Sequence, residues 1–132
     1  MNVNRKGVKG LIRVIDDLQD KGYYVFPAFD DHSPVDLIAL SSTGQTFRLQ
    51  VKYRQKIARQ KAERYELTAS SVVNGKKVLI DKTLIDGWAV YLADAGKVVY
   101  INKNLLGSKN GMLIDPSKEY GELAEWPNAG VC

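Results

Sequence analysis

Residues 35–54 contain three side chains that together could cleave a phosphodiester bond. They are a carboxylate, Asp36, an amide, Gln50, and an amine, Lys52. Carboxylate, amide and backbone carbonyl oxygens are hard ligands, which suit a small divalent cation such as Mg²⁺ that keeps several of its waters. A lysine is a compact positive charge that can hold a phosphate oxygen or orient an attacking water. The candidate catalytic residues are therefore Asp36, Gln50 and Lys52, and the candidate metal ligands are Asp36, Gln50 and the carbonyl of Val51.

A β-hairpin is expected to bring these groups together. In FRLQVKYR, residues 47–54, apolar and polar residues alternate strictly, as in a strand with one apolar and one polar face. If SSTGQ closes the hairpin so that Leu40 pairs with Thr46, Asp36 lies opposite Gln50. Lys52 is then on the diagonal, and all three side chains share one face. A shift of one residue would place them on opposite faces.

The same pairing has a plainer interpretation. Asp36 and Lys52 could form a solvated ion pair on the surface of a sheet, worth little free energy. Such cross-strand pairs are common. Pairing geometry alone favours this interpretation, so the case for chemistry depends on the rest of the chain.

Other elements are expected around this hairpin, in a sheet that is antiparallel early in the chain and mixed later. Apolar residues from Val8 to Leu18 recur at helical spacing, and Lys21-Gly22 can close that helix. The remaining candidates are a short strand at 23–27, a strand at 64–70, a hairpin with an Asn-Gly turn at 72–80, and a hairpin at 87–101 closed at 94–97. The tail, 102–132, is interpreted as packing or oligomer contact.

Composition limits the class of protein. The 132 residues are 45% hydrophobic and 26% charged, which predicts a single domain over 1–132 with one core. No segment resembles a signal peptide or approaches the roughly eighteen apolar residues of a membrane helix, so we expect a cytoplasmic protein with no membrane partner. The chain has one cysteine and one histidine, too few for the four Cys or His ligands of a structural zinc site.

The net charge of +4 and its distribution favour a polyanionic partner. Basic residues crowd the beginning of the chain and the stretch after the hairpin. The candidate nucleic-acid-binding residues are Lys6, Lys9, Arg54, Lys56, Arg59, Lys61 and Arg64. The alternative is an ordinary solvated helix face and loop.

The order of these features resembles the PD-(D/E)XK nuclease superfamily over about the first half of the chain. Pro34-Val35-Asp36 corresponds to the Pro-Asp element, and Gln50-Val51-Lys52 corresponds to (D/E)-x-K. With glutamine in that place, the chain resembles most the group I intron-associated homing endonucleases. The archaeal Holliday junction resolvases share the same plan more distantly. The resemblance implies an α/β, restriction-endonuclease-like mixed β-sheet flanked by helices. It also implies hydrolysis of DNA phosphodiester bonds with Mg²⁺, or with Mn²⁺ as a second candidate, by a homo-oligomer, either a dimer or a tetramer.

The chain departs from this pattern in its acids. Relatives usually have a glutamate on the first helix, four residues after a glycine such as Gly7, where this chain has Leu11. The acids that could substitute are Asp30, Asp31 and Glu66, although each is more typical of a solvated turn or strand face. His32, the only histidine, is interpreted as a turn residue rather than a general base. Two alternatives to an enzyme therefore stay open: a catalytically degraded nuclease-fold DNA-binding protein, and an interaction domain without catalysis.

Overall fold

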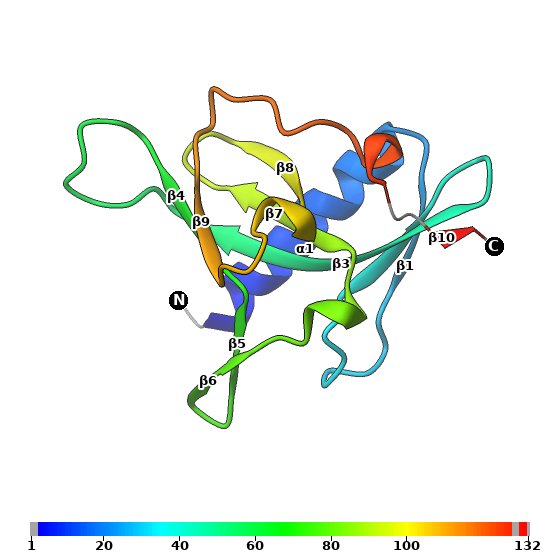
Figure 1. Cartoon of the computed structure of the whole chain (residues 1–132), viewed down its shortest axis with the longest axis horizontal. Helices are drawn as coiled ribbons and strands as arrows, with labels where there is room; N and C mark the ends of the chain where they lie inside the picture. Colours follow the sequence, from blue (N-terminus) through cyan, green and yellow to red (C-terminus); the bar gives the residue numbers. More distant parts are fainter. Residues whose placement is uncertain (1–2, 128–129, 132) are drawn as a thin grey trace.

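A mixed β-sheet with one long helix on one of its faces forms the body of the protein (Figure 1). The computed structural model describes residues 3–127 and 130–131. The elements are α1 (Val3–Asp20), β1 (Tyr24–Pro27), β2 (Leu37–Leu40), β3 (Gln45–Arg54), β4 (Tyr65–Thr68), β5 (Ser70–Val73), β6 (Lys76–Leu79), η1 (Lys82–Leu84), β7 (Gly87–Leu92), β8 (Lys97–Asn102), η2 (Lys103–Leu105), β9 (Gly111–Ile114), η3 (Leu123–Glu125) and β10 (Gly130–Val131). The main sheet runs β1-β2-β3-β7-β8, and β10 pairs with β3.

Strand β3 is the centre of this sheet, and its pairing confirms the predicted hairpin register. Leu40 lies opposite Thr46, and Leu37 lies opposite Leu49. On its other side β3 runs parallel to β7, which makes the sheet mixed, as expected. The expected α/β class is confirmed. The expectation of flanking helices is corrected, because α1 is the only α-helix in the described part of the chain.

Helix α1 covers one face of the sheet because its apolar side chains recur along one side. Val14 and Leu18 are completely buried against Phe47 and Leu49 of β3. Gly10 faces Tyr53 so closely that an added Cβ would lie 3.2 Å from the tyrosine Cβ. The helix is thereby pressed against the carboxyl half of β3, where the candidate site lies. Nowhere in the described residues is there a helix with the length and apolarity needed to cross a membrane.

The other face of the sheet is covered by strands rather than by a second helix. Trp88 and Val90 of β7 pack there with Tyr65 and Leu67 of β4. Strand β4 pairs with β9 from the tail, so the packing interpretation of the tail is confirmed. Side chains of β3 with even numbers, including Gln50 and Lys52, belong to this strand-covered face because those with odd numbers face α1.

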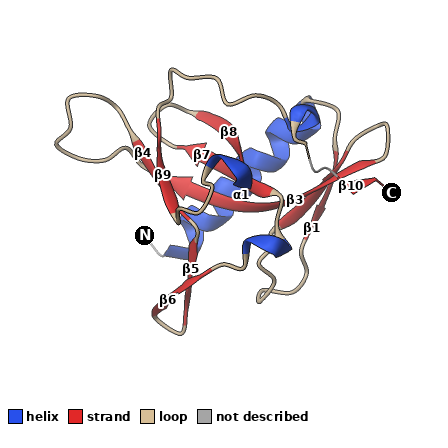
Figure 2. Cartoon of the chain, viewed as in Figure 1, coloured by secondary structure: helices blue, strands red, loops and turns tan. Residues whose placement is uncertain are grey.

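A two-stranded hairpin, β5–β6, projects from this face away from the main sheet (Figure 2). Its turn residues, Asn74 and Gly75, have φ values of 51° and 76°. Two successive positive φ angles define the turn that Asn-Gly favours, so the predicted hairpin and turn are confirmed. The predicted hairpin at 87–101 is confirmed as β7 and β8.

Candidate active site

Asp36 lies where β2 separates from β3. Its backbone N–H donates to the carbonyl of Leu49 at 2.9 Å, although Leu49 is already paired with Leu37. Asp36 and Leu37 therefore both lie opposite Leu49, and two residues opposite one is the arrangement of a β-bulge. The carboxylate then takes the place of a backbone acceptor: Val51 donates its N–H to Oδ2 of Asp36 at 2.7 Å. The predicted pairing of Asp36 with Gln50 is corrected by this bulge.

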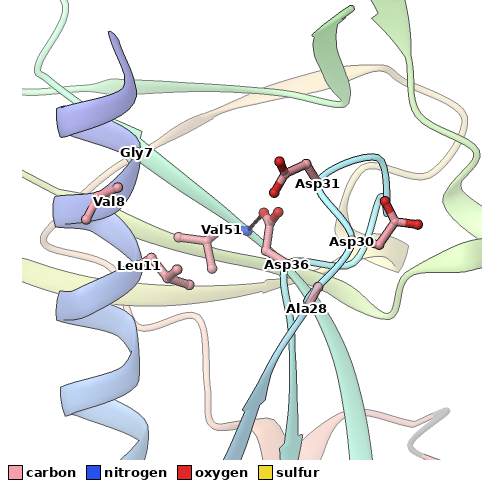
Figure 3. A pocket seen from close by; sticks show the side chains of 8 residues that line it. All are labelled: Gly7, Val8, Leu11, Ala28, Asp30, Asp31, Asp36 and Val51. Carbon is pink, nitrogen blue, oxygen red and sulfur yellow. Dashed lines mark hydrogen bonds between the residues drawn. The ribbon is translucent and has the colours of Figure 1, made fainter. Parts of the chain in front are cut away.

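The bulge directs Asp36 into a cleft of about 640 Å³ between α1 and the loop after β1 (Figure 3). The cleft is lined by Gly7, Val8, Leu11, Ala28, Asp30, Asp31, Asp36 and Val51. Leu11 thus occupies the helix position that projects toward Asp36. In Figure 3 the carboxylate of Asp31 points toward that of Asp36, whereas the carboxylate of Asp30 points away.

The surroundings of Asp36 disfavour its charge. Burial raises the pKa of the Asp36 carboxyl, while the Val51 N–H and the positive charge of Lys52 act to lower it. Within the described residues, the only hydrogen bond that this carboxylate accepts comes from Val51, through Oδ2. Oδ1 therefore remains available to a ligand in the cleft.

Lys52 lies on the strand-covered face, one residue beyond Val51. Its Nζ donates to the carbonyl of Ser70 at 2.6 Å. Burial lowers the pKa of Lys52 to about 8, helped by the charges of Arg54 and Lys77 and opposed by that of Asp36. Lys52 and Asp36 thus influence each other electrostatically without forming an ion pair.

Gln50 lies on the same face and is held at both ends of its amide. Its Oε1 accepts from the indole Nε1 of Trp88 at 3.1 Å, and its Nε2 donates to Oγ of Ser71 at 3.2 Å. The indole can only donate, so it fixes which end of the amide is oxygen. The side chain is 5% exposed. One lone pair of Oε1 is therefore already used within the fold.

The three predicted catalytic residues surround Val51 rather than meeting on one face. Gln50 and Lys52 share a face, as alternation predicts, while Asp36 reaches the backbone of Val51 through the gap opened by the bulge. In a strand the N–H and C=O of one residue point to the same edge. The Val51 carbonyl is therefore directed to the edge where Asp36 lies, as a candidate ligand should be.

The donor set fits a hydrated magnesium ion better than a fully enclosed metal site. Among the described residues, no three His, Cys, Asp or Glu side chains form a metal-binding group. Magnesium usually keeps several waters and binds protein through one or two carboxylates, and Asp36 with Asp31 can supply two. Of the other acids considered, Glu66 does not line the cleft. His32 is exposed beside Asp30, 3.4 Å from its carboxylate, as a turn residue would be.

The predicted nucleic-acid-binding residues fall into two groups. Some are held by the fold: Arg54 donates to the Glu66 carbonyl, Arg64 lies 3.4 Å from Asp115, and Lys6 donates to Gln55. The others, Lys9, Lys56, Arg59 and Lys61, are exposed. Lys56, Arg59 and Lys61 lie on the loop between β3 and β4, which extends from the body in Figure 1. Their position makes contact with a phosphate backbone sterically feasible.

The sequence did not indicate two features of this region. One is the bulge at Asp36, and the other is the pair of residues that hold Gln50, namely Trp88 and Ser71. Both depend on contacts between distant segments. Asp31 is no stronger a candidate than its neighbour Asp30 by sequence, because nothing local distinguishes the two acids. The signal that separates them is the direction of each side chain relative to Asp36.

Known proteins share the fold of this chain. The family model described as PD-(D/E)XK endonuclease matches residues 1–118. The structure of a bacterial homing endonuclease, I-Ssp6803I, is similar with a TM-score of 0.68 and 11% sequence identity, over 94% of this chain and 86% of that chain. At this identity the likeness shows the fold, a restriction-endonuclease-like mixed sheet. None of the curated proteins compared with the chain matches it.

Proposed function

The chain belongs to the PD-(D/E)XK endonuclease family, and from this membership we propose that it hydrolyses DNA phosphodiester bonds with a bound divalent metal ion. Nucleases of this family generally use divalent metals. The observation that carries the proposal is the placement of Asp36. Its carboxylate is fixed by the Val51 N–H at the mouth of a cleft, with one oxygen uncommitted within the described residues.

We assign the metal to Asp36, the Val51 carbonyl and Asp31, with Mg²⁺ as the first candidate and Mn²⁺ as the second. When bound, the ion would make a water more acidic and stabilise negative charge on the phosphate. Asp31 would supply the second acid that Leu11 does not. Gln50 is the remaining predicted ligand. An amide oxygen has two lone pairs, and Trp88 uses one, so ligation by Gln50 stays a prediction.

Lys52 would stabilise the charge that develops on the phosphate. Its ammonium lies on the next residue after the metal-facing carbonyl, in a partly buried position where a fixed charge is more effective than in water. Its pKa of about 8 keeps most of the population charged at neutral pH. The Ser70 carbonyl orients the amine, so little reorganisation is needed when a phosphate arrives.

The proposal also covers how the protein contacts DNA and how many copies of the chain act together. The basic loop and α1 would contact the phosphate backbone of DNA. Cutting both strands requires two hydrolyses, so one site per chain favours a dimer or tetramer. Exposed Val8 and Ile12 on α1 support such a contact between copies. A homing-endonuclease-like or junction-resolvase-like target follows from the resemblance of Gln50-Val51-Lys52.

A DNA-binding protein without catalysis is the second candidate. Leu11 in the cleft and the hydrogen-bonded amide of Gln50 favour it, because both reduce the number of oxygens available to a metal. The two candidates share the same DNA contacts. They differ in whether Asp36 binds a divalent ion.

Two measurements on the purified protein separate these candidates. We expect nicking of supercoiled plasmid or cleavage of a four-way junction with Mg²⁺ or Mn²⁺, and none with chelator. Calorimetry should show a metal site that Asp36→Ala abolishes. DNA binding without metal binding or cleavage would favour the second candidate. Binding that changes little between low and high salt would favour an interaction domain of another kind.

A further inference from the structure

The β5–β6 hairpin is an exposed apolar structure that the catalytic proposal does not use. Its two strands pair only with each other, and it projects from the body (Figure 1). Val72 is 74% exposed and Leu79 is 60% exposed. A lone two-stranded hairpin is marginally stable in water, and exposed valines on it gain nothing from burial. Such a surface is typical of a binding element.

The charge of the hairpin indicates which class of partner it fits. Residues 70–80 contain no acid and two lysines, Lys76 and Lys77, directly after the turn. Each lysine is the cross-strand partner of a valine: Lys77 lies opposite Val72, and Lys76 lies opposite Val73. Because successive residues of a strand point to opposite faces, each face of the tip carries one valine and one lysine. The tip is thus both cationic and apolar, and in a member of an endonuclease family DNA is the partner that offers phosphates and thymine methyl groups to it.

The base of the hairpin is attached directly to the candidate active site. Lys52 donates to the carbonyl of Ser70, and Gln50 donates to the hydroxyl of Ser71, and both serines belong to β5. The hairpin position is therefore fixed relative to the residues on either side of Val51.

A groove also connects the two regions. It has a volume of about 470 Å³ and runs between the hairpin and residues 31–34. Asp31 lines both this groove and the cleft that contains Asp36. A polymer lying in the cleft can therefore continue along the groove to the hairpin.

We propose that the β5–β6 hairpin enters the major groove of duplex DNA beside the bond to be cut, with Lys76 and Lys77 on phosphates and Val72 on base edges. This inference rests on the proposed function and names its DNA contact. The major groove, about 12 Å wide, admits a two-stranded ribbon. Valine is suited to the methyl group of thymine, whereas lysines reaching the groove walls contribute sequence-independent affinity.

The arrangement also explains why Gln50 is buried between Trp88 and Ser71. With its amide bound to the core on one side and to the hairpin on the other, Gln50 acts as a positioning residue. DNA seated on the hairpin would then hold a phosphate at a fixed distance from Lys52. Gln50 can have this role whether or not the second lone pair of its Oε1 binds the metal.

The test is DNA binding as a function of salt, measured by fluorescence anisotropy with a short labelled duplex. Calcium replaces magnesium so that the duplex stays intact. Each phosphate contact contributes about 0.9 to the slope of log K against log salt concentration. We expect Lys77→Ala to reduce that slope by about 1 and Lys76→Ala/Lys77→Ala by about 2. The matched control is Lys118→Ala, in the exposed segment after β9, which lies at the top of Figure 1 and away from the hairpin.

The outcomes separate this proposal from the proposed function. If the double variant binds with unchanged affinity and slope, the hairpin does not contact DNA, whereas plasmid cleavage by the same preparation would leave the proposed function intact. If the unmodified protein binds no duplex, the hairpin proposal is overturned, and cleavage of plasmid or of a four-way junction then decides the proposed function. Val72→Ser provides a second readout: selection from a random-sequence duplex pool should lose a thymine preference while the salt slope stays the same. Unchanged selection would remove Val72 from the base contacts.

Discussion

Two carboxylates hold the backbone of β3 in the same way but differ in everything else they bind. Asp86 accepts the N–H of Arg48 at 2.7 Å, and Asp36 accepts the N–H of Val51 at the same distance. Asp86 is buried, and its other oxygen accepts from the guanidinium of Arg48 at 3.0 Å. The carboxylate of Asp36 accepts no second hydrogen bond within the described residues, and its other oxygen faces the cleft.

The difference separates an acid that is fully used by the fold from the acid that we propose for the site. A carboxylate whose two oxygens are both paired stabilises the fold and has nothing left for a ligand. Burial without full pairing raises the pKa of Asp36, which means that its charge opposes folding. A bound cation would compensate for that charge. Incomplete pairing of a partly buried acid is therefore the physical mark of the site.

The largest expected effect comes from Asp36→Asn. The carboxamide oxygen can still accept from the Val51 N–H, and the unfavourable charge is removed. The melting temperature at pH 7 should therefore stay the same or rise. Cleavage should fall by about a thousandfold, equivalent to about 4 kcal/mol of transition-state stabilisation. Thermal unfolding and single-turnover cleavage of a labelled duplex measure the two effects.

Asp86→Asn is the matched control for that variant. It leaves Arg48 without its charged partner, so the free energy of unfolding should fall by about 2 kcal/mol. Cleavage well below the melting temperature should remain near that of the unmodified protein. If Asp36→Asn lowers stability as much as Asp86→Asn does, the distinction between the two acids is wrong.

The next effect concerns the amine of the site. The pKa of Lys52 is lowered to about 8 from an ordinary value of 10.5, so the charged amine is less favourable in the folded state. Between these values the unfolded chain binds more protons, and stability must rise with pH. The unmodified protein should therefore gain stability relative to Lys52→Met from about pH 8 to 10.5, and below pH 8 the difference should be constant. Chemical denaturation across this range measures it.

The pKa of the Lys52 amine also predicts how cleavage depends on pH. If the charged amine stabilises the phosphate, cleavage should decline as the pH rises through about 8, and Lys52→Met should lose about a hundredfold at pH 7. Lys52→Arg keeps its charge and should shift the decline to higher pH. A decline at the same pH in Lys52→Arg would assign it to another group.

The smallest expected effect comes from adding a second carboxylate beside Asp36. Leu11→Glu adds a carboxylate to the cleft beside Asp36 and should tighten Mg²⁺ binding by about tenfold in calorimetry. The control is Gln19→Glu, also on α1, because Gln19 is exposed and does not line the cleft. Equal gains for both variants would mean that only net charge matters and that Leu11 does not face the metal.

Much of the fold was predictable because it depends on local patterns. The alternation along 47–54 predicted the apolar and polar faces of β3, and the structure packs the apolar face on α1. The Asn-Gly turn predicted the β5–β6 hairpin. Apolar spacing predicted α1 and its end near Gly22. The face opposite α1 was less predictable, because it is covered by β4 and β9, whose paired residues are 43 or more positions apart in the sequence.

The sequence by itself determined the register of the central hairpin and the residues that flank Val51, since strand alternation has a period of two and needs no distant partner. Only the tertiary structure decided what those residues contact. The bulge turns Asp36 toward the cleft, Trp88 and Ser71 hold Gln50, and Ser70 orients Lys52. These contacts join segments 13 to 38 residues apart, and a hydrogen bond between such segments is fixed by how the whole chain packs, which no local pattern encodes.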